Sequence, residues 1–379
     1  MKRSYQICTN CIMDTSDQYI SFDEQGTCEY CQNYFSTIEP SWKADVSAPE
    51  KLQEMARKIK ARSTGEFDCI IGLSGGLDSS YAAHVAVVEM GLRPLLFHVD
   101  AGWNSDIAVG NIEKLVDGLN LDLYTEVVDW GLVRDLQVAF LKSGIPDQDL
   151  VQDAAFFSAL YQFARKNKVK HIITGSNFST ECCREPEAWG GYLGIDKRMF
   201  LDICRNFGSE KIIDNFPLID ILKYKIWYQY ILGFTVYHPL NFTNFNKVNA
   251  EKKLNDVYGW LPLKHKHHES RFTRFYEDYW LPRRFGFEKR RAHFSSLIMT
   301  GQMTRKEALN RISVPELDEH MLNQEFNYVA SKLGLTKGEL NELFTMPKRT
   351  YRDFKNKRAI INLGSWFLHY FGKEKRFLR

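Results

Sequence analysis

Residues 70–84 read IIGLSGGLDSSYAAH: an apolar run, then a turn rich in glycine and serine, then a run of helical character. The pattern predicts a buried strand that leads through a tight turn into a helix. Glycine lets the backbone of such a turn approach a ligand and adopt positive φ angles. The helix N-terminus offers free amide groups and the positive end of its dipole. With its serine hydroxyls, the turn therefore predicts a binding site for an anion such as phosphate.

The turn also carries a carboxylate, Asp78, inside the expected phosphate site. It is not a Walker A loop, because the GK[ST] ending is missing, and it lacks the Rossmann spacing G-x-G-x-x-G. Phosphate would repel Asp78 unless a divalent cation lay between them, so we expect Mg²⁺ there. The alternative is a turn that only connects a strand to a helix. The predicted phosphate-binding residues are Ser74, Gly75, Gly76, Asp78, Ser79 and Ser80.

From Phe67 onward, short β-rich runs alternate with helical patterns. Such alternation predicts an α/β fold in which a doubly wound parallel sheet has helices on both faces. After about residue 220 the pattern becomes mostly helical. Strands are expected within residues 68–74, 93–102, 121–130 and 170–177, and helices within residues 79–91, 105–119 and 153–167.

Polar residues follow these strands at the sheet edge where open α/β folds bind ligands. Asp100 ends the second strand and is a candidate ligand contact, although a cap or turn role explains it equally well. Asp153 begins a helix, where capping is the alternative to a site role. The later strand end adds an expected nucleotide floor of Gly175, Ser176 and Asn177, with Glu181 as a second magnesium ligand.

Four cysteines near the N-terminus, Cys8, Cys11, Cys28 and Cys31, form two C-x2-C pairs separated by 16 residues. Each pair can turn two thiolates toward one point, so together they predict a tetrahedral zinc site. The surrounding segment is too short for a core of its own, so the metal would supply much of its folding free energy. Four cysteines leave no open coordination position, which indicates a structural role. Two unrelated pairs, a redox site and an iron–sulfur cluster are the alternatives.

The composition is that of a globular protein of two or three domains, with 379 residues, 44% apolar and 26% charged. A net charge of only +3 argues against a dedicated nucleic-acid binder. There is no apolar run of about 18 residues, so no membrane span is expected, and the N-terminus lacks the apolar segment of a signal peptide. We therefore expect a cytoplasmic protein whose eight cysteines are metal ligands, reactive thiols or core residues.

The motif S-G-G-x-D-S after a strand resembles the pyrophosphate loop (PP-loop) of the ATP pyrophosphatases. Members of that superfamily cleave ATP between the α and β phosphates and activate a carbonyl-type oxygen as its adenylate. The resemblance implies ATP and Mg²⁺ as cofactors, and it places Asp100 at the position that meets adenosine. The predicted segments are a zinc knuckle at 1–40, a helical linker at 41–65, a PP-loop domain at 66–235 and a basic helical region at 236–379.

The stretch KHHESRFTRFYEDYWLPRRFGFEKRRAHFSSLIMTGQMTRKEAL at 266–309 resembles the signature of the N-acetyl sugar amidotransferases. The resemblance also covers the N-terminal cysteine pairs, the PP-loop and residues 144–181. It implies the conversion of an acetamido group on a bacterial surface-polysaccharide sugar to an acetamidino group, in O-antigen or pseudaminic-acid-type synthesis. The chain has Met13 where the family usually has proline, and His268 where it usually has tyrosine; the second difference bears on the sugar contacts.

The resemblance further implies that ammonia comes from a separate glutaminase, beside which a cyclase-like barrel protein often stands. The chain itself has Lys2 where a fused N-terminal-nucleophile glutaminase needs cysteine, and no nucleophile elbow with cysteine. The implied catalytic residues are Asp78, Lys266, Arg290 and His293, and the implied substrate contacts are Glu181, His268, Glu269, Arg271 and Arg291. His267, His268, Glu269 and His293 are all open as the proton-transfer group, and a solvated surface is the alternative for the basic stretch.

The main rival is a tRNA thiolation enzyme, because a cysteine pair, Cys182 and Cys183, follows the last expected strand. Nearly balanced charge and the lack of an RNA-binding module argue against it. Packing or a substrate-loop role is the expected function of this pair, and Cys69 is expected in the core. A third alternative is a non-catalytic scaffold that uses the zinc knuckle for partner binding. Such a protein would not need the motif residues of the turn Ser74–Ser79.

Overall fold

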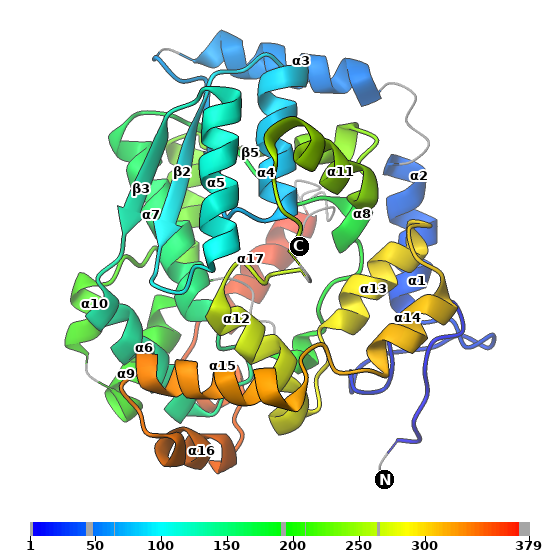
Figure 1. The fold of residues 1–379 in the computed structure, drawn as a ribbon, viewed down its shortest axis with the longest axis vertical. Helices are drawn as coiled ribbons and strands as arrows, with labels where there is room; N and C mark the ends of the chain where they lie inside the picture. Colours follow the sequence, from blue (N-terminus) through cyan, green and yellow to red (C-terminus); the bar gives the residue numbers. More distant parts are fainter. Residues whose placement is uncertain are drawn as a thin grey trace.

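The computed structural model describes residues 3–42, 48–63, 65–190, 195–208, 210–263 and 266–370 (Figure 1). At its centre lies a parallel sheet with the strand order β3-β2-β1-β4-β5. Ile71 of β1 pairs with Leu96 of β2 on one side and with Ile173 of β4 on the other. The strands are β1 Cys69–Gly72, β2 Pro94–Asp100, β3 Leu123–Val127, β4 His171–Ile173 and β5 Thr235–Tyr237.

Helices cover both faces of this sheet. The helices between residues 48 and 231 are α3 Ala48–Arg62, α4 Leu77–His84 with its π-helical continuation η2 Val85–Glu89, α5 Asp106–Leu119, α6 Trp130–Ser143, α7 Leu150–Lys166, α8 Phe178–Glu181, η3 Glu187–Trp189, α9 Lys197–Phe207, α10 Lys211–Asn215 and η4 Lys223–Ile231. The side chains of β1 alternate between the faces, as the pleat of a strand requires. Ile70 packs in one core with residues of α6, α7 and α9, whereas Cys69 and Ile71 pack in a second core with residues of α3, α4 and α5.

These two cores confirm the predicted doubly wound parallel sheet and the core position of Cys69. The four expected strands and three expected helices are all present, each close to its predicted range. The edge strand β5 was not predicted, and neither were several helices before residue 220, among them α6, α9 and α10. β5 continues past the proposed boundary at residue 235, and the linker helix α3 buries Leu52, Ala56 and Ile59 in the second core, so neither segment is separate from the sheet domain.

The strand order changes direction at β1. The next strands in the chain, β2 and β3, lie on one side of it, and β4 and β5 lie on the other. The carboxyl ends of β1 and β4 are therefore neighbours at the switch point where open α/β sheets bind ligands. The turn Ser74–Gly76 leaves β1 at this point, and Gly175 and Ser176 follow β4.

The C-terminal half is helical, as predicted. It comprises η5 Pro239–Phe242, α11 Lys247–Tyr258, α12 Arg271–Phe275, η6 Tyr276–Phe285, α13 Arg290–Met299, α14 Arg305–Ile312, α15 Glu319–Lys332, α16 Lys337–Thr345, η7 Tyr351–Asp353 and α17 Arg358–Tyr370. Figure 1 shows α13 and α14 beside the N-terminal segment, which contains α1 Glu29–Asn33, η1 Tyr34–Ile38 and α2 Glu39–Trp42. Within the described ranges, every helix is too short or too polar to cross a membrane.

Candidate active site

The turn between β1 and α4 is anchored from several directions. The Gly76 amide donates to Ser74 Oγ at 3.3 Å within the turn. From neighbouring elements, Asn111 Nδ2 and Trp260 Nε1 donate to the Gly75 carbonyl at 3.1 and 3.2 Å. No side chain of the described residues caps the N-terminus of α4 by a hydrogen bond. Its first amides are therefore available to an anion.

Glycine is required in this turn because other backbone lies within van der Waals distance. Gly75 has φ of +80°, and a Cβ there would lie 2.3 Å from the carbonyl oxygen of Ala108. A Cβ on Gly175, after β4, would lie 2.4 Å from the carbonyl carbon of Asp78. The first turn of α4 therefore rests directly on the loop that follows β4, which is why these two sequence-predicted segments form one site.

Lys266 joins the C-terminal half of the chain to this turn. Its Nζ lies 3.1 Å from Asp78 Oδ2 and 2.6 Å from Glu181 Oε1. Burial alone would lower the pKa of Lys266, but the two carboxylates outweigh it and raise the pKa, so the ammonium stays charged. Burial raises the pKa of Asp78, and Lys266 opposes that shift. Three residues predicted from distant parts of the sequence are thus in direct contact.

Asp78 and Glu181, the predicted magnesium ligands, share Lys266 as their counter-ion. Within the described part of the chain, no group of three ligand atoms close enough to hold a metal includes them. Mg²⁺ commonly takes one or two carboxylates and completes its shell with waters and phosphate oxygens. The pair therefore fits a magnesium ion that arrives with a nucleotide, whose phosphate charge it would neutralise.

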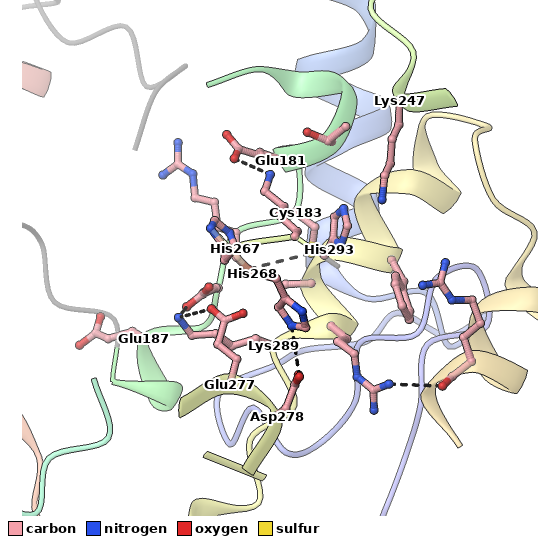
Figure 2. A pocket seen from close by; sticks show the side chains of 18 residues that line it. Glu181, Cys183, Glu187, Lys247, His267, His268, Glu277, Asp278, Lys289 and His293 are labelled. Atoms are coloured by element: carbon pink, nitrogen blue, oxygen red, sulfur yellow. Dashed lines mark hydrogen bonds and ion pairs between the residues drawn. The ribbon is translucent and has the colours of Figure 1, made fainter. Parts of the chain in front are cut away.

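Two cavities adjoin at Lys266. The first, of about 220 Å³, is lined by the turn residues Ser74, Asp78 and Ser79 and by Gly175 and Ser176. The second, of about 500 Å³, extends toward α13 and η6 (Figure 2). Their common wall consists of Thr180, Glu181, Lys247, Lys266, His267 and His293. A phosphate compound in the first cavity would thus lie next to a second molecule in the other.

Ion pairs cross the second cavity. Lys289 Nζ lies 3.2 Å from Glu185 Oε2 and 3.4 Å from Glu277 Oε1, and the interaction with Glu277 is visible in Figure 2. His268 Nε2 lies 3.1 Å from Asp278 Oδ2, and both side chains are nearly inaccessible to solvent. His268, a predicted substrate contact, therefore has a carboxylate partner in the cavity wall.

Acidic side chains gather behind Lys289. Burial raises the pKa of Asp147 to about 8, of Asp149 to about 7 and of Asp153 to about 6, and Lys289 opposes each shift. Asp153 is nonetheless exposed to solvent, so it does not lie in a packed core. The Asp149 carboxylate accepts a hydrogen bond from Thr273 Oγ1 at 3.1 Å. Asp153 does not cap the helix, because α7 begins at Leu150 and its N-cap residue is Asp149.

Several predicted nucleotide contacts are used inside the protein instead. Ser80 is fully buried beneath the turn. Asp100 Oδ1 accepts the Gly102 amide at 2.7 Å, which is the turn role that the sequence left open. Asn177 caps α8 through the Thr180 amide and is also buried. None of Ser80, Asp100 and Asn177 lines either cavity of the described chain.

Three predicted arginines also have internal partners. Arg290, in the second cavity's wall, pairs with Glu288 at 2.8 Å and with Glu316 at 2.9 Å. Arg291 pairs with Asp14 at 3.1 Å, and Arg271 pairs with Glu325 at 2.9 Å; neither lines a cavity. The sequence showed their charge but not these partners, which lie far away in the chain. We therefore do not place Arg271 and Arg291 at the substrate.

Sequence reasoning missed several residues of the second cavity. Lys247 begins α11 and lines the common wall (Figure 2). Arg311 lies over the Phe294 ring, with its guanidinium carbon 4.7 Å from the ring centroid. Lys289 lies in the basic stretch 266–309, where the sequence alone does not distinguish its role from that of the neighbouring lysine and arginine residues. No motif in the sequence marks Lys247, because it belongs to helix α11, which only the fold brings to the site.

The four N-terminal cysteines form one cluster. Their Sγ atoms all lie within 4.8 Å of one another, with Cys8 and Cys31 at 3.9 Å and Cys11 and Cys28 at 3.6 Å. These separations are too long for disulfides and suit the edges of a tetrahedron with metal–sulfur bonds of about 2.3 Å. All four are buried. The cluster fits the predicted structural zinc.

This knuckle supports the wall of the second cavity. Its cysteines pack with Cys182, Cys183, Trp189, Ala292 and Met299 in one apolar cluster. Arg305 of α14 donates to the carbonyl oxygens of Cys8 and Cys11 at 2.8 and 2.9 Å. Both Cys182 and Cys183 are therefore in packing positions, as expected, and Cys183 also lines the second cavity.

Comparisons with known proteins bear mainly on the C-terminal half. Two solved structures show distant likeness. NMN synthetase from Francisella tularensis is 19% identical over 59% of this chain and 94% of that chain, with a TM-score of 0.28. NH3-dependent NAD synthetase from Campylobacter jejuni subsp. jejuni NCTC 11168 in complex with the nitrate ion is 17% identical over 58% of this chain and 98% of that chain, with a TM-score of 0.29. Such low TM-scores assign neither fold nor activity. No curated protein matches the chain. Residues 269–367 match the family described as LPS biosynthesis protein WbpG-like, C-terminal domain, so the chain carries a region similar to that domain, in agreement with the resemblance of its motifs.

Proposed function

We propose that this protein is an ATP-dependent, AMP-forming amidotransferase that converts an acetamido group of a bacterial surface-polysaccharide sugar precursor to an acetamidino group. The observation that carries the proposal is the contact between the two cavities. A glycine- and serine-rich turn at an uncapped helix N-terminus lines the first cavity, and Lys266, His267 and His293 separate it from a second cavity of about 500 Å³. That volume is within the usual range for small-molecule sites.

The chemistry requires such an arrangement. An amide oxygen is a weak nucleophile and a very poor leaving group until it is bound to phosphorus. Attack of this oxygen on the α-phosphorus of ATP forms an O-adenylate and releases pyrophosphate. The amides of α4 with Ser74 and Ser79 would hold the departing pyrophosphate, while Lys266 would stabilise the charge that develops on it. Asp78 and Glu181 would hold the magnesium ion.

The substrate class rests on the C-terminal region. Residues 269–367 match a domain named for LPS biosynthesis, and the second cavity is lined largely by residues of this half of the chain. Carboxylates, histidines and lysines on its wall can bind sugar hydroxyls and an anionic group. We place the reaction in the cytoplasm. Ammonia would come from a separate glutaminase, with a cyclase-like barrel protein as a further partner.

The experiment is a substrate panel. Purified protein with ATP, Mg²⁺ and ammonium chloride is given UDP-N-acetylglucosamine, UDP-N-acetylgalactosamine, CMP-N-acetylneuraminate and their free sugars in turn. We expect AMP and pyrophosphate to appear only with an N-acetylated sugar, together with a slightly lighter sugar in which NH replaces oxygen. Sugar-independent release of AMP, or a sugar of unchanged mass, would contradict the proposal.

Sulfur transfer to tRNA is the second candidate, because Cys183 lines the second cavity. A sulfur-carrying cysteine must form a thiolate readily. Burial instead raises the pKa of Cys182 to about 12 and raises that of Cys183 well above its ordinary value. Incorporation of radiolabelled sulfur into tRNA by the purified protein would favour this candidate over amidination.

A further inference from the structure

His267 occupies the common wall of the two cavities. It lines both, and its side chain is exposed within them. Its neighbours in sequence point elsewhere: Lys266 binds Asp78, and His268 is buried against Asp278. No hydrogen bond or ion pair joins the His267 imidazole to another residue that the structure describes. The ring is therefore free to contact a molecule in the wall between the cavities (Figure 2).

The backbone of His267 is in an unusual conformation. Its φ of +64° lies in the left-handed region, which residues other than glycine adopt at a cost. Asn120, another residue with positive φ, has an ordinary reason, because it ends helix α5. His267 ends no helix. Its left-handed conformation lets Lys266 reach Asp78, His267 face the cavities and His268 reach Asp278. Strain of this kind at a cavity wall is typical of functional positions.

On this basis, and resting on the proposed function, we propose that His267 is the general base that takes a proton from the nitrogen added to the activated carbon. Ammonia adds to the carbon of the O-adenylated amide and forms a C–N bond, which leaves the new nitrogen with three hydrogens and a positive charge. His267 accepts one of these protons. The C–O bond then breaks, AMP leaves with the electron pair, and the amidinium product remains.

The charged groups around His267 suit this role. Although the His267 side chain is exposed into the cavities, the protein around it desolvates the imidazole, and this is the main cause that lowers the pKa of His267 well below its ordinary value. Lys266, Lys289 and His268 add to the shift, so the free imidazole is neutral and can accept a proton. Lys266 and Lys289 are each paired with two carboxylates, which offset their repulsion of the protonated ring.

His293 is the competing histidine of the common wall. Burial also lowers its pKa, with contributions from Lys266, Lys247, His267 and Arg311. Lys247 has only a 3.9 Å contact with Glu251, and Arg311 is placed over the Phe294 ring. A protonated His293 would therefore meet less compensated positive charge than a protonated His267. This difference favours His267 as the base.

The test separates adenylation from ammonia addition. His267→Asn removes the base but keeps a residue that tolerates the left-handed conformation, and His320→Gln changes a histidine on α15 outside both cavities as the matched control. With the panel sugar of highest turnover, each protein is assayed for sugar-dependent ATP–pyrophosphate exchange without ammonium and for amidination with ammonium. We expect H267N to lose about 10²-fold or more in amidination, as removal of a general base does, with exchange within about threefold of wild type. H320Q should match wild type in both assays.

A second variant keeps the result independent of folding. His267→Gly relieves the backbone strain and leaves a space for added imidazole, which should restore part of the amidination in proportion to its unprotonated form. Full amidination by H267N, or an equal loss of exchange and amidination without imidazole rescue of H267G, would contradict the role of His267. Wild-type protein without sugar-dependent exchange would instead contradict the proposed function itself.

Discussion

The Glu269 carboxylate lies against the Gly76 backbone: a Cβ built on Gly76 would be 1.6 Å from Glu269 Oε1. Gly76 precedes α4 in the glycine-rich turn, whereas Glu269 begins the region that matches the WbpG-like domain. Burial raises the pKa of Glu269 to about 7. The C-terminal half thus completes the first cavity and is not an appended domain, so a change at this contact tests whether the cavity binds the nucleotide.

Replacing Gly76 by alanine should displace either Glu269 or the turn. We expect ATP affinity to fall at least tenfold, measured by isothermal titration calorimetry, with a parallel loss of pyrophosphate release. Gly110→Ala in α5 is the matched control, because nothing lies within 4 Å of a Cβ there. That change should raise the free energy of unfolding by up to about 1 kcal/mol, as alanine does in helices. Normal ATP binding by G76A would show that the turn is not the nucleotide site.

Asp78 is expected to act on the phosphates and not on the fold. Asp78→Asn should lower sugar-dependent pyrophosphate release by about 10²-fold or more, because charge placed at a phosphoryl transfer site contributes on that scale. Zinc content should stay unchanged, since the cysteine cluster is separate from the turn. Asp135→Asn on α6, an exposed carboxylate, serves as the control. Retained release with D78N would remove the proposed metal role.

Arg305 should couple the zinc knuckle to α14. Arg305→Ala deletes its hydrogen bonds to the Cys8 and Cys11 carbonyls, and we expect a loss of about 2 kcal/mol in the free energy of unfolding. Zinc, measured by mass spectrometry, should stay bound. Lys306→Ala, an exposed neighbour, should have little effect. Cys28→Ser should instead lose the metal and reduce Tm further; a zinc-free C28S protein of unchanged Tm would contradict the structural role.

The buried carboxyl group of Asp147 should make stability depend on pH. Burial raises the pKa of Asp147 to about 8, well above the value of about 3.9 for an unfolded chain. Between these values the folded protein binds more protons than the unfolded one, so the free energy of unfolding should decrease as pH rises. Asp147→Asn, which mimics the protonated form, should therefore raise Tm at pH 8 and leave it nearly unchanged at pH 4. The same gain at both pH values would contradict this assignment.

The fold was predictable because local signals agreed along the sheet. Apolar β-rich runs marked β1 to β4, and the glycine-rich turn fixed the point at which β1 ends. β5 was missed because Thr235–Tyr237 is only three residues long and follows an aromatic segment with helical character. Its strand identity comes from pairing with β4, which the local sequence does not encode.

The site was predictable only in part, for a similar reason. Asp78, Glu181 and Lys266 could be identified by motif, and the structure brings them together. Arg271 and Arg291 carry the same positive charge as Lys266, but they pair with Glu325 and Asp14 away from the cavities. A sequence shows where a charge is, whereas its role depends on partners brought near by folding. Residues without a motif, such as Lys247, could be found only in the structure.

The most direct measurement of the central claim is the identity of the nucleotide products. Phosphorus NMR of a reaction with ATP, Mg²⁺, ammonium and the active N-acetylated sugar would resolve them as the reaction proceeds. The account predicts AMP and pyrophosphate in equal amounts, because the turn Ser74–Ser79 receives the β and γ phosphates as one leaving group. Formation of ADP and inorganic phosphate would contradict it.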